Sequence, residues 1–285
     1  MNLITVETAD GYLLTSTVFA VNSPTVPVRG GILLAGAMAT PQLHYQAFAS
    51  WLAQQGYCVM TLDYRGTFAS GGRQVASTNA SFDTWGQQDV SAVARALQQQ
   101  VPDQPLFYIG HSLGGQLFAS SETTGLFERA VIVASGSGYW PRLRKAVPRW
   151  GLFVATQIWA PLLVPLFGYF PGARLRKIGD LPAGVVRQWS RWCRHPDYLA
   201  RDVHQRERFE CVQTPITYIN SCDDEVFSQW SVDRFVELFG VRSQPVQCLT
   251  LNPASLGVSR IGHFGYFRER MRDSLWPQLV QLLRA

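Results

Sequence analysis

The sequence predicts an α/β fold, in which a mostly parallel, eight-stranded sheet is flanked by helices and carries one inserted helical segment. Short apolar runs alternate with helical patterns along most of the chain, and several of these runs are apolar throughout. One internal segment also differs in composition from both of its flanks. With 285 residues, 47% of them hydrophobic and 16% charged, the chain can bury a full core, which excludes a disordered protein.

Eight segments have the length and apolar character of strands. The first two meet at Asp10-Gly11, a favourable pair for a hairpin turn. The third, GILLA, is apolar throughout, as expected of a parallel strand covered on both faces. The expected strands are residues 3–7, 13–21, 31–35, 57–64, 106–110, 130–134, 216–220 and 246–251.

Helical patterns separate these strands. Residues 43–55 end at Gly56, a common residue at a helix C-terminus. Residues 82–100 carry Trp85, Val90, Val93 and Leu97 at roughly helical spacing. The other expected helices are residues 115–123, 231–239 and 267–283.

Residues 137–206 differ from the rest of the chain in charge and in tryptophan content. They carry 12 Lys and Arg against 3 Asp and Glu, a net +9, whereas the other residues carry 13 against 17, a net −4. They also hold five of the nine tryptophans. We therefore expect residues 1–136 and 207–285 to form one core and residues 137–206 to form a helical insertion.

Several classes of protein and of site are not indicated. The five cysteines are scattered without CxxC pairs and do not cluster with histidines, so we expect no metal site and no disulfide framework. The first residues lack the basic stretch and apolar run of a signal peptide, which favours a cytoplasmic protein. The pI of about 9.1 could suggest nucleic acid, but apolar runs interrupt the basic residues and no recognition motif accompanies them.

The sequence GHSLGG at positions 110–115 is the motif that points most directly to chemistry. It follows an apolar strand and precedes a helix, which is the context required of a GxSxG nucleophile turn. Residues flanking the serine in so tight a turn must be nearly free of side chain, as Gly110 and Gly114 are. Ser112 is the expected nucleophile, and the alternative is a purely structural turn.

A serine nucleophile needs a base that is itself oriented by an acid. Three acids, Asp223, Asp224 and Glu225, follow the strand at 216–220. We take Asp224 as the orienting acid and expect Asp223 and Glu225 to belong to a solvated turn.

His263 is the expected base, because it follows the last strand in the glycine-flanked loop IGHFG. The neighbour of the serine, His111, should point away from it. His44 near the start of a helix is more typical of a surface residue than of a substrate contact. His195 and His204 lie in the basic insertion and need no catalytic role.

These features resemble the α/β-hydrolase superfamily, and in particular the lid-bearing serine hydrolases of the monoacylglycerol lipase and serine aminopeptidase type. The resemblance spans nearly the whole chain and includes the sequence DYRG at 63–66. Its usual acidic turn reads Gly-x-x-Asp-x-Val, and residues 221–226 depart from it only at Ser221, which supports Asp224. Arg65 and Asp63 are expected to brace their loop rather than contact substrate.

The resemblance also implies an oxyanion hole made of two backbone amides. After the third strand the family often has His-Gly, whereas this chain has Ala35-Gly36. The amides of Ala37 and Leu113 are the implied donors, and Met38 replaces Ala37 if the turn is shifted by one residue. Backbone donors do not depend on side-chain identity.

The resemblance places a variable cap after the sixth strand, where the insertion lies. Residues 150–170 are 21 residues without a charged side chain, long enough to span a bilayer. Pro161, Pro165 and the continuation of the sheet on both sides oppose a span. We expect a packed lid hairpin with its apolar side towards the site, or else an interfacial segment whose basic flanks meet anionic headgroups. Those flanks are Arg142, Arg144, Lys145 and Arg149 before it, and Arg174, Arg176 and Lys177 after it.

The sequence thus predicts a serine hydrolase that cleaves a small-molecule ester with an apolar acyl or alkyl group, through an acyl-enzyme and without a cofactor. Two alternatives keep the same residues: acyl transfer to another acceptor, and hydrolysis of an amide or peptide. A third is a non-catalytic lipid-binding or scaffolding module. Peripheral contact with a membrane through the basic insertion is a further expectation.

Overall fold

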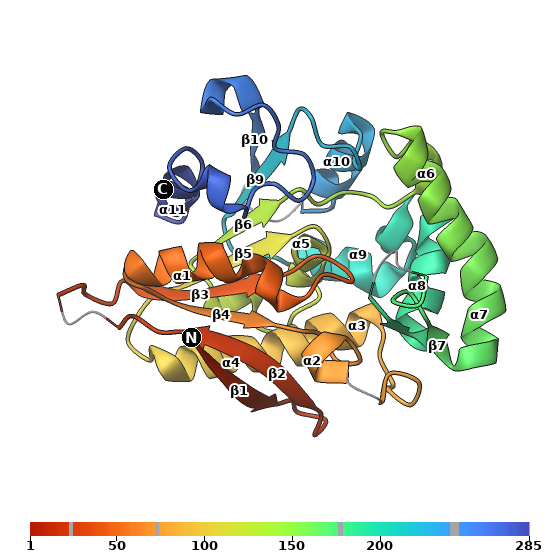
Figure 1. Ribbon diagram of the computed structural model, residues 1–285, viewed down its shortest axis with the longest axis horizontal. Coiled ribbons are helices and arrows are strands. Elements are labelled where there is room, and N and C mark those ends of the chain that lie inside the picture. The colour runs from red at the N-terminus through yellow and green to blue at the C-terminus, as the bar shows by residue number, and fades with distance from the viewer. Residues whose placement is uncertain (23–24, 72–73, 176–178, 240–244, 285) are drawn as a thin grey trace.

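A mixed sheet of eight strands forms the centre of the molecule (Figure 1), as the sequence predicts. The computed structural model describes residues 1–22, 25–71, 74–175, 179–239 and 245–284. The strands lie in the order β1-β2-β4-β3-β5-β6-β9-β10. Only β2 runs antiparallel to its neighbours, β1 and β4, and the remaining pairs are parallel. The strands are β1 (Asn2–Glu7), β2 (Leu13–Phe19), β3 (Gly30–Ala35), β4 (Tyr57–Leu62), β5 (Leu106–His111), β6 (Arg129–Val133), β9 (Ile216–Ser221) and β10 (Gln247–Leu251).

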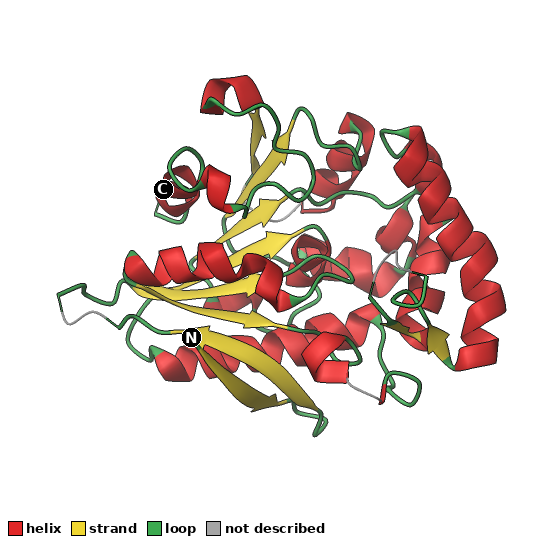
Figure 2. Cartoon of the chain, in the orientation of Figure 1, coloured by secondary structure: helices red, strands yellow, loops and turns green. Residues whose placement is uncertain are grey.

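Helices cover both faces of this sheet (Figure 2). On β3, Ile32 packs in the cluster that includes Phe48 of α1, whereas Leu33 packs in the cluster that includes Val93 of α4. This alternation explains why the strand is apolar throughout: successive side chains enter two different cores. The helices of the sheet layers are α1 (Gln46–Gln54), α2 (Phe68–Gly71), α3 (Phe82–Thr84), α4 (Ser91–Gln100), α5 (Leu113–Phe118), α10 (Gln229–Val236) and α11 (Trp276–Leu282).

Several of the expected helices differ from the structure. The helix expected at 115–123 is shorter, because α5 spans only Leu113–Phe118. The π-helical turn Trp85–Val90 joins α3 and α4, so the expected helix at 82–100 is continuous but not wholly α-helical. The expected helix at 267–283 is wrong at its start, because α11 begins only at Trp276. Pro277 has no amide hydrogen, and its ring would clash with the carbonyl four residues earlier if the helix extended backwards.

The described residues between 137 and 206, which the sequence predicts to be an insertion, are mostly helical, and Figure 1 shows their helices beside one end of the sheet. They contain α6 (Ala146–Phe153), α7 (Ala160–Phe167), α8 (Ala183–Cys193), the start of α9 (Val203–Glu210) and a small sheet of β7 (Tyr169–Phe170) and β8 (Leu181–Pro182). The expected hairpin is wrong, because the π-helical turn Val154–Trp159 joins α6 and α7 into one helical run. The Ala160 amide bonds to the Ala155 carbonyl, which widens the helix just before Pro161.

This run, Ala146–Phe167, is the one helix in the described part of the chain that is long and apolar enough to cross a membrane. Its most apolar window has a mean hydropathy of 1.5, and only 17% of that window is buried. The flanking strands β6 and β9 pair in parallel within one sheet. A single membrane crossing would separate them, so the sheet argues against a span.

Candidate active site

Ser112 lies in a sharp turn between β5 and α5, where the sequence places the nucleophile. Its φ of 53° and ψ of −110° are values that residues other than glycine rarely adopt. A Cβ at Gly114 would lie 2.1 Å from the Ala35 carbonyl oxygen, and one at Gly110 would lie 2.7 Å from the Gly115 nitrogen. The two glycines therefore allow the turn, and the helix that follows directs free amides towards the serine.

The structure brings Ser112, His263 and Asp224 together in one hydrogen-bonded row. His263 Nδ1 lies 2.9 Å from Asp224 Oδ2, and His263 Nε2 lies 3.1 Å from Ser112 Oγ. The other Asp224 oxygen accepts the amides of Val226 and Phe227 at 2.7 and 3.2 Å. Because the carboxylate can only accept, His263 donates from Nδ1, and its Nε2 is left to take the serine proton.

The acids on either side of Asp224 hold the histidine loop, so the expectation of a solvated turn is wrong. Asp223 accepts the amides of Ile261 and Gly262 at 2.9 and 3.0 Å, and Glu225 accepts the His263 amide at 3.1 Å. Burial opposes ionisation of Asp223, but hydrogen bonds from Ser221 and these two amides outweigh it and lower the Asp223 pKa. Sequence spacing could not reveal these bonds, which link residues nearly forty positions apart.

A second buried row of hydrogen bonds links the loop after β3 to the histidine loop. The Ala37 amide donates to the Tyr45 hydroxyl at 2.7 Å, and that hydroxyl lies 2.8 Å from His111 Nδ1. His111 Nε2 lies 2.9 Å from the His263 carbonyl, which can only accept. Burial, and secondarily the nearby His263, hold the pKa of His111 well below its usual range, so the ring is neutral and Tyr45 is the donor to it.

The hydrogen bonds of Tyr45 change the expected set of oxyanion-hole donors. The Ala37 amide already donates to Tyr45, so Ala37 is not a free donor. The amides of Met38 and Leu113 have no protein acceptor within the described ranges, and both residues line the cavity at Ser112. The alternative with the turn shifted to Met38 is the arrangement that the structure favours.

Ser112 opens into a mainly apolar cavity of about 160 Å³. Core residues form one wall, and residues of the inserted segment form the other. A dry cavity of roughly 150 Å³ is known to hold benzene, so this one has room for a small acyl group. Its lining residues are Met38, Ser112, Leu113, Gln116, Gly138, Leu143, Pro148, Leu152, Trp189, Tyr198, Val226 and Phe227.

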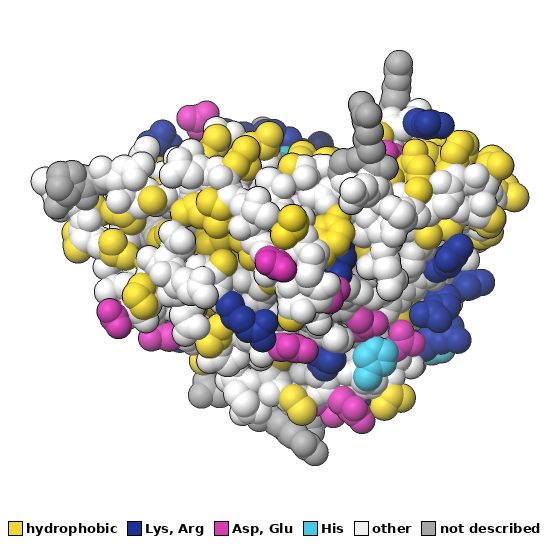
Figure 3. All heavy atoms as spheres, turned by 90° about the horizontal axis from the view of Figure 1, so that it is seen from below, with side chains coloured by type: hydrophobic (Ala, Val, Ile, Leu, Met, Phe, Trp, Pro, Cys, Tyr) yellow, Lys and Arg dark blue, Asp and Glu magenta, His cyan; other side chains and the backbone are white. Residues whose placement is uncertain are grey.

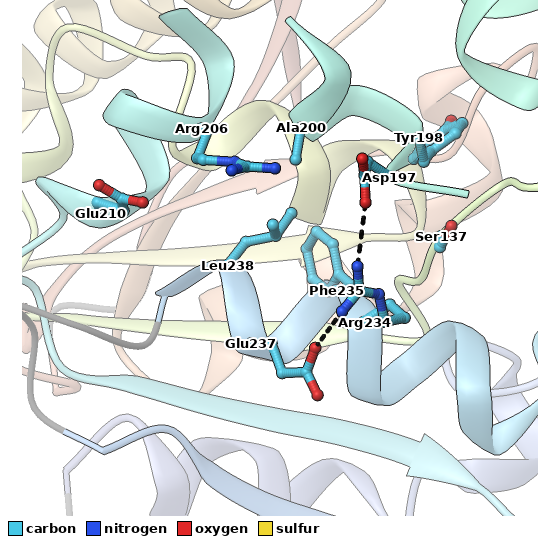
Figure 4. A pocket seen from close by; sticks show the side chains of 10 residues that line it. All are labelled: Ser137, Asp197, Tyr198, Ala200, Arg206, Glu210, Arg234, Phe235, Glu237 and Leu238. Atoms are coloured by element: carbon cyan, nitrogen blue, oxygen red, sulfur yellow. Dashed lines mark hydrogen bonds and ion pairs between the residues drawn. The ribbon is translucent and has the colours of Figure 1, made fainter. Parts of the chain in front are cut away.

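A separate hollow of about 310 Å³ also has Tyr198 in its lining (Figure 4). Its lining is strongly charged, and Arg234 pairs there with Asp197 and with Glu237, each at 3.0 Å. Tyr198 is buried and contributes to the walls of both spaces. The charged lining does not suit an apolar acyl group, so the cavity at Ser112 is the candidate site.

Asp63 and Arg65 have the bracing role that the sequence predicts. Arg65 is buried and pairs with Asp89 at 2.6 Å and with Asp10 at 2.5 Å. Asp63 accepts the Gln42 amide at 2.8 Å. Both side chains therefore fix the loop after β4, Arg65 to the first hairpin and Asp63 to the 3₁₀ turn Gln42–Tyr45 that precedes α1.

The remaining histidines make contacts away from Ser112. The His44 ring packs edge-on against Phe264, with centroids 5.9 Å apart, and burial lowers the His44 pKa. His195 Nδ1 lies 3.6 Å from an Asp197 oxygen, and His204 Nε2 lies 3.1 Å from an Asp83 oxygen. None of the three forms a hydrogen bond with the serine in the part of the chain that the structure describes.

The strand order and the sharp turn that carries Ser112 are those of an α/β-hydrolase. Residues 27–243 match the model of the serine aminopeptidase S33 family, and the chain belongs to this family of enzymes. The match includes Ser112 and Asp224 and ends before His263. No curated protein matches the sequence significantly.

Solved structures of similar fold include several esterases and a lipase. A soluble variant of monoglyceride lipase from Saccharomyces cerevisiae has a TM-score of 0.69 and 16% identity, over 99% of this chain and 94% of that one. The Pyrococcus furiosus esterase has a TM-score of 0.63 and 14% identity, over 99% and 91%. A putative aryl esterase from Burkholderia cenocepacia has a TM-score of 0.60 and 16% identity, over the full length of both chains. At these identities the likeness supports the fold alone.

Proposed function

We propose that this α/β-hydrolase is a serine esterase in which Ser112, His263 and Asp224 form the catalytic triad. The hydrogen-bonded row of the three side chains, at 3.1 and 2.9 Å, is the observation that carries the proposal. The family match and the esterase-like folds support it.

The reaction follows from the positions of these groups. Ser112 Oγ attacks the ester carbonyl carbon while His263 Nε2 takes the hydroxyl proton. The amides of Met38 and Leu113 stabilise the resulting oxyanion, and Asp224 stabilises the imidazolium. His263 then gives the proton to the departing alcohol, which leaves an acyl-serine. A water molecule, deprotonated by the same histidine, releases the acid and restores Ser112.

The cavity supports an apolar acyl group as the substrate moiety. Of the described residues that line it, only Ser112 and Gln116 carry a purely polar side chain. At about 160 Å³ it holds a group of roughly benzene size, so a longer chain requires the inserted segment to move aside as a lid. We expect activity to rise from acetyl towards medium-chain esters, and a preference for acetyl over octanoyl esters would contradict an apolar acyl site.

Labelling with a fluorophosphonate probe tests the nucleophile. The native protein should be labelled, Ser112→Ala should not, and His263→Ala should be labelled far more slowly. Ser255→Ala changes an exposed serine and is the matched control. Labelling of Ser112→Ala equal to that of the native protein would overturn the mechanism, and so would absence of labelling in the native protein, which would favour a non-catalytic module.

The family name makes aminopeptidase activity the second candidate. An aminopeptidase must bind a free α-amino group, for which a carboxylate is the ordinary partner. Among the described residues, none of those that line the cavity at Ser112 is acidic, which favours an ester. A panel of matched esters and amides, with and without an acceptor alcohol, separates hydrolysis of an ester, hydrolysis of an amide and acyl transfer.

A further inference from the structure

Four of the basic residues on either side of the long helix Ala146–Phe167 contact other parts of the described protein. Arg144 donates to the carbonyls of Cys222 and Asp224 at 2.6 and 3.1 Å, and Arg149 donates to the Leu143 carbonyl at 2.8 Å. The guanidinium groups of Arg142 and Arg174 lie over aromatic rings, at 5.5 and 5.4 Å from the centroids. These four arginines are therefore engaged within the protein, whereas Lys145 is exposed, and Arg176 and Lys177 lie outside the described residues.

A second group of arginines lies on α8 and directly after its last residue, Cys193. Arg187, Arg191 and Arg194 follow one another at helical spacings of four and three residues, so they share one face. All three are exposed, and within the described ranges none has an acidic partner or a hydrogen bond. Three guanidinium groups without partners on one face form a strongly cationic surface.

These arginines line a groove of about 590 Å³ between α8 and α7. Ser190 lies in the same lining, is 8% exposed, and has a hydroxyl without a partner in the described part of the chain. Asp83, the one acid among the lining residues, is held by Gln188 at 2.8 Å and faces His204 at 3.1 Å. The groove therefore keeps an excess of positive charge and an unused hydroxyl.

The other wall of this groove is apolar and continues onto an exposed apolar surface. Pro161 and Pro165 of α7 line the groove. Their neighbours Leu162 and Leu166 are 65% and 73% exposed, and Trp150 of α6 is 56% exposed. Figure 3 shows hydrophobic and basic side chains gathered side by side at the end of the molecule where Figure 1 places these helices.

We propose that this surface, the α7–α8 groove with the exposed face of α6 and α7, docks the protein on an anionic phospholipid bilayer. The arginines of α8 bind lipid phosphates, while the leucines and Trp150 enter the headgroup boundary. Guanidinium groups beside an apolar wall match a ligand with an anionic head and an apolar body, which a bilayer presents and a nucleic acid does not. The bilayer would then supply apolar esters beside the segment that covers Ser112.

Co-sedimentation with vesicles of stated composition tests the docking surface. The Ser112→Ala protein serves for this assay, so that the outcome does not depend on esterase activity. It should bind vesicles of phosphatidylcholine with about 30% phosphatidylglycerol more tightly than vesicles of phosphatidylcholine alone, and raised salt should weaken that binding. At roughly fivefold for each cation lost from the membrane surface, the triple variant R187Q/R191Q/R194Q should partition about 100-fold less.

Matched variants make the result specific to this surface. The variant R268Q/R270Q/R272Q removes the same charge from exposed positions of the core and should bind as the parent protein does. The variant R187K/R191K/R194K keeps the charge and should retain binding, and Leu162→Ser with Leu166→Ser should lose it. Circular dichroism and the melting temperature report whether each variant is folded.

Equal binding by R187Q/R191Q/R194Q and its parent would overturn the proposal. Equal binding to the two kinds of vesicle would do so as well. Retention of a single-stranded RNA through the same arginines, with no binding to vesicles, would show a nucleic acid as the occupant and refute a bilayer. None of these outcomes bears on fluorophosphonate labelling, so the esterase proposal is tested separately.

Discussion

Replacement of Tyr45 by Phe removes one hydroxyl that satisfies two buried groups. The hydroxyl accepts from the Ala37 amide at 2.7 Å and lies 2.8 Å from His111 Nδ1, to which it donates. Tyr45, Ala37 and His111 are all almost fully buried, so water cannot replace the lost hydroxyl without reorganising the site. The phenylalanine ring fills the same space, and the effect is therefore confined to hydrogen bonding.

The expected cost follows from the number of groups left without a partner. A buried donor or acceptor that loses its partner costs about 1–3 kcal/mol, so the Ala37 amide and the His111 nitrogen together should cost roughly 2–6 kcal/mol. Because His111 also holds the His263 carbonyl at 2.9 Å, labelling of Ser112 by a fluorophosphonate should slow as well.

Urea unfolding followed by tryptophan fluorescence measures this loss as a lower midpoint at unchanged slope. Tyr57→Phe is the matched control, because that buried ring bonds through its hydroxyl to the exposed Arg284 at 2.8 Å, and water can satisfy the arginine. The free energy of unfolding of this control should fall by less than about 1 kcal/mol. A fall in the free energy of unfolding of less than about 0.5 kcal/mol for Tyr45→Phe would refute the role assigned to this hydroxyl.

Three further changes have defined outcomes. Asp224→Asn should lower kcat by about 10⁴-fold with the fold intact, measured on a chromogenic ester, because the histidine loses its orienting acceptor; a loss under tenfold would argue against the triad. Arg65, by its hydrogen bonds, lowers the Asp10 pKa to about 2, so the stabilisation is full above about pH 4 and is lost as pH falls through 2. Asp10→Asn should therefore lower the melting temperature at pH 6 and lose this difference near pH 2; a difference that is constant with pH would contradict the pairing. Gly114→Ala should destabilise the protein by about 3 kcal/mol, since its Cβ would meet the Ala35 carbonyl at 2.1 Å, whereas Gly125→Ala has open space and should not; equal stability of the two variants would contradict the tight turn.

The sequence predicts the strands of this protein more accurately than its helices. Each strand is a short apolar run between turn residues. This local pattern predicts a strand whichever residues later pack against it. The ends of helices depend on single residues, as Pro277 shows by delaying α11. The two prolines of Ala146–Phe167 predict an interrupted helix, but a π-helical turn just before Pro161 keeps the helix continuous.

In the candidate site too, the sequence predicts some residues and only the structure identifies others. Ser112, Asp224 and His263 could be chosen in advance because each follows the carboxyl end of a strand in a loop of recognisable chemistry. The oxyanion donor could not, because it depends on which amide Tyr45 engages, and spacing along the chain carries no information on that bond.

By itself the sequence determined the α/β fold, the turn at Ser112 and the excess of positive charge in residues 137–206, because these depend on local pattern and composition. Only the tertiary structure decided that Asp223 and Glu225 hold the His263 loop and that Met38 rather than Ala37 is free to donate. It also decided which cations of the inserted segment remain free. Each of these depends on contacts between residues far apart in the chain, which form only when the sheet assembles.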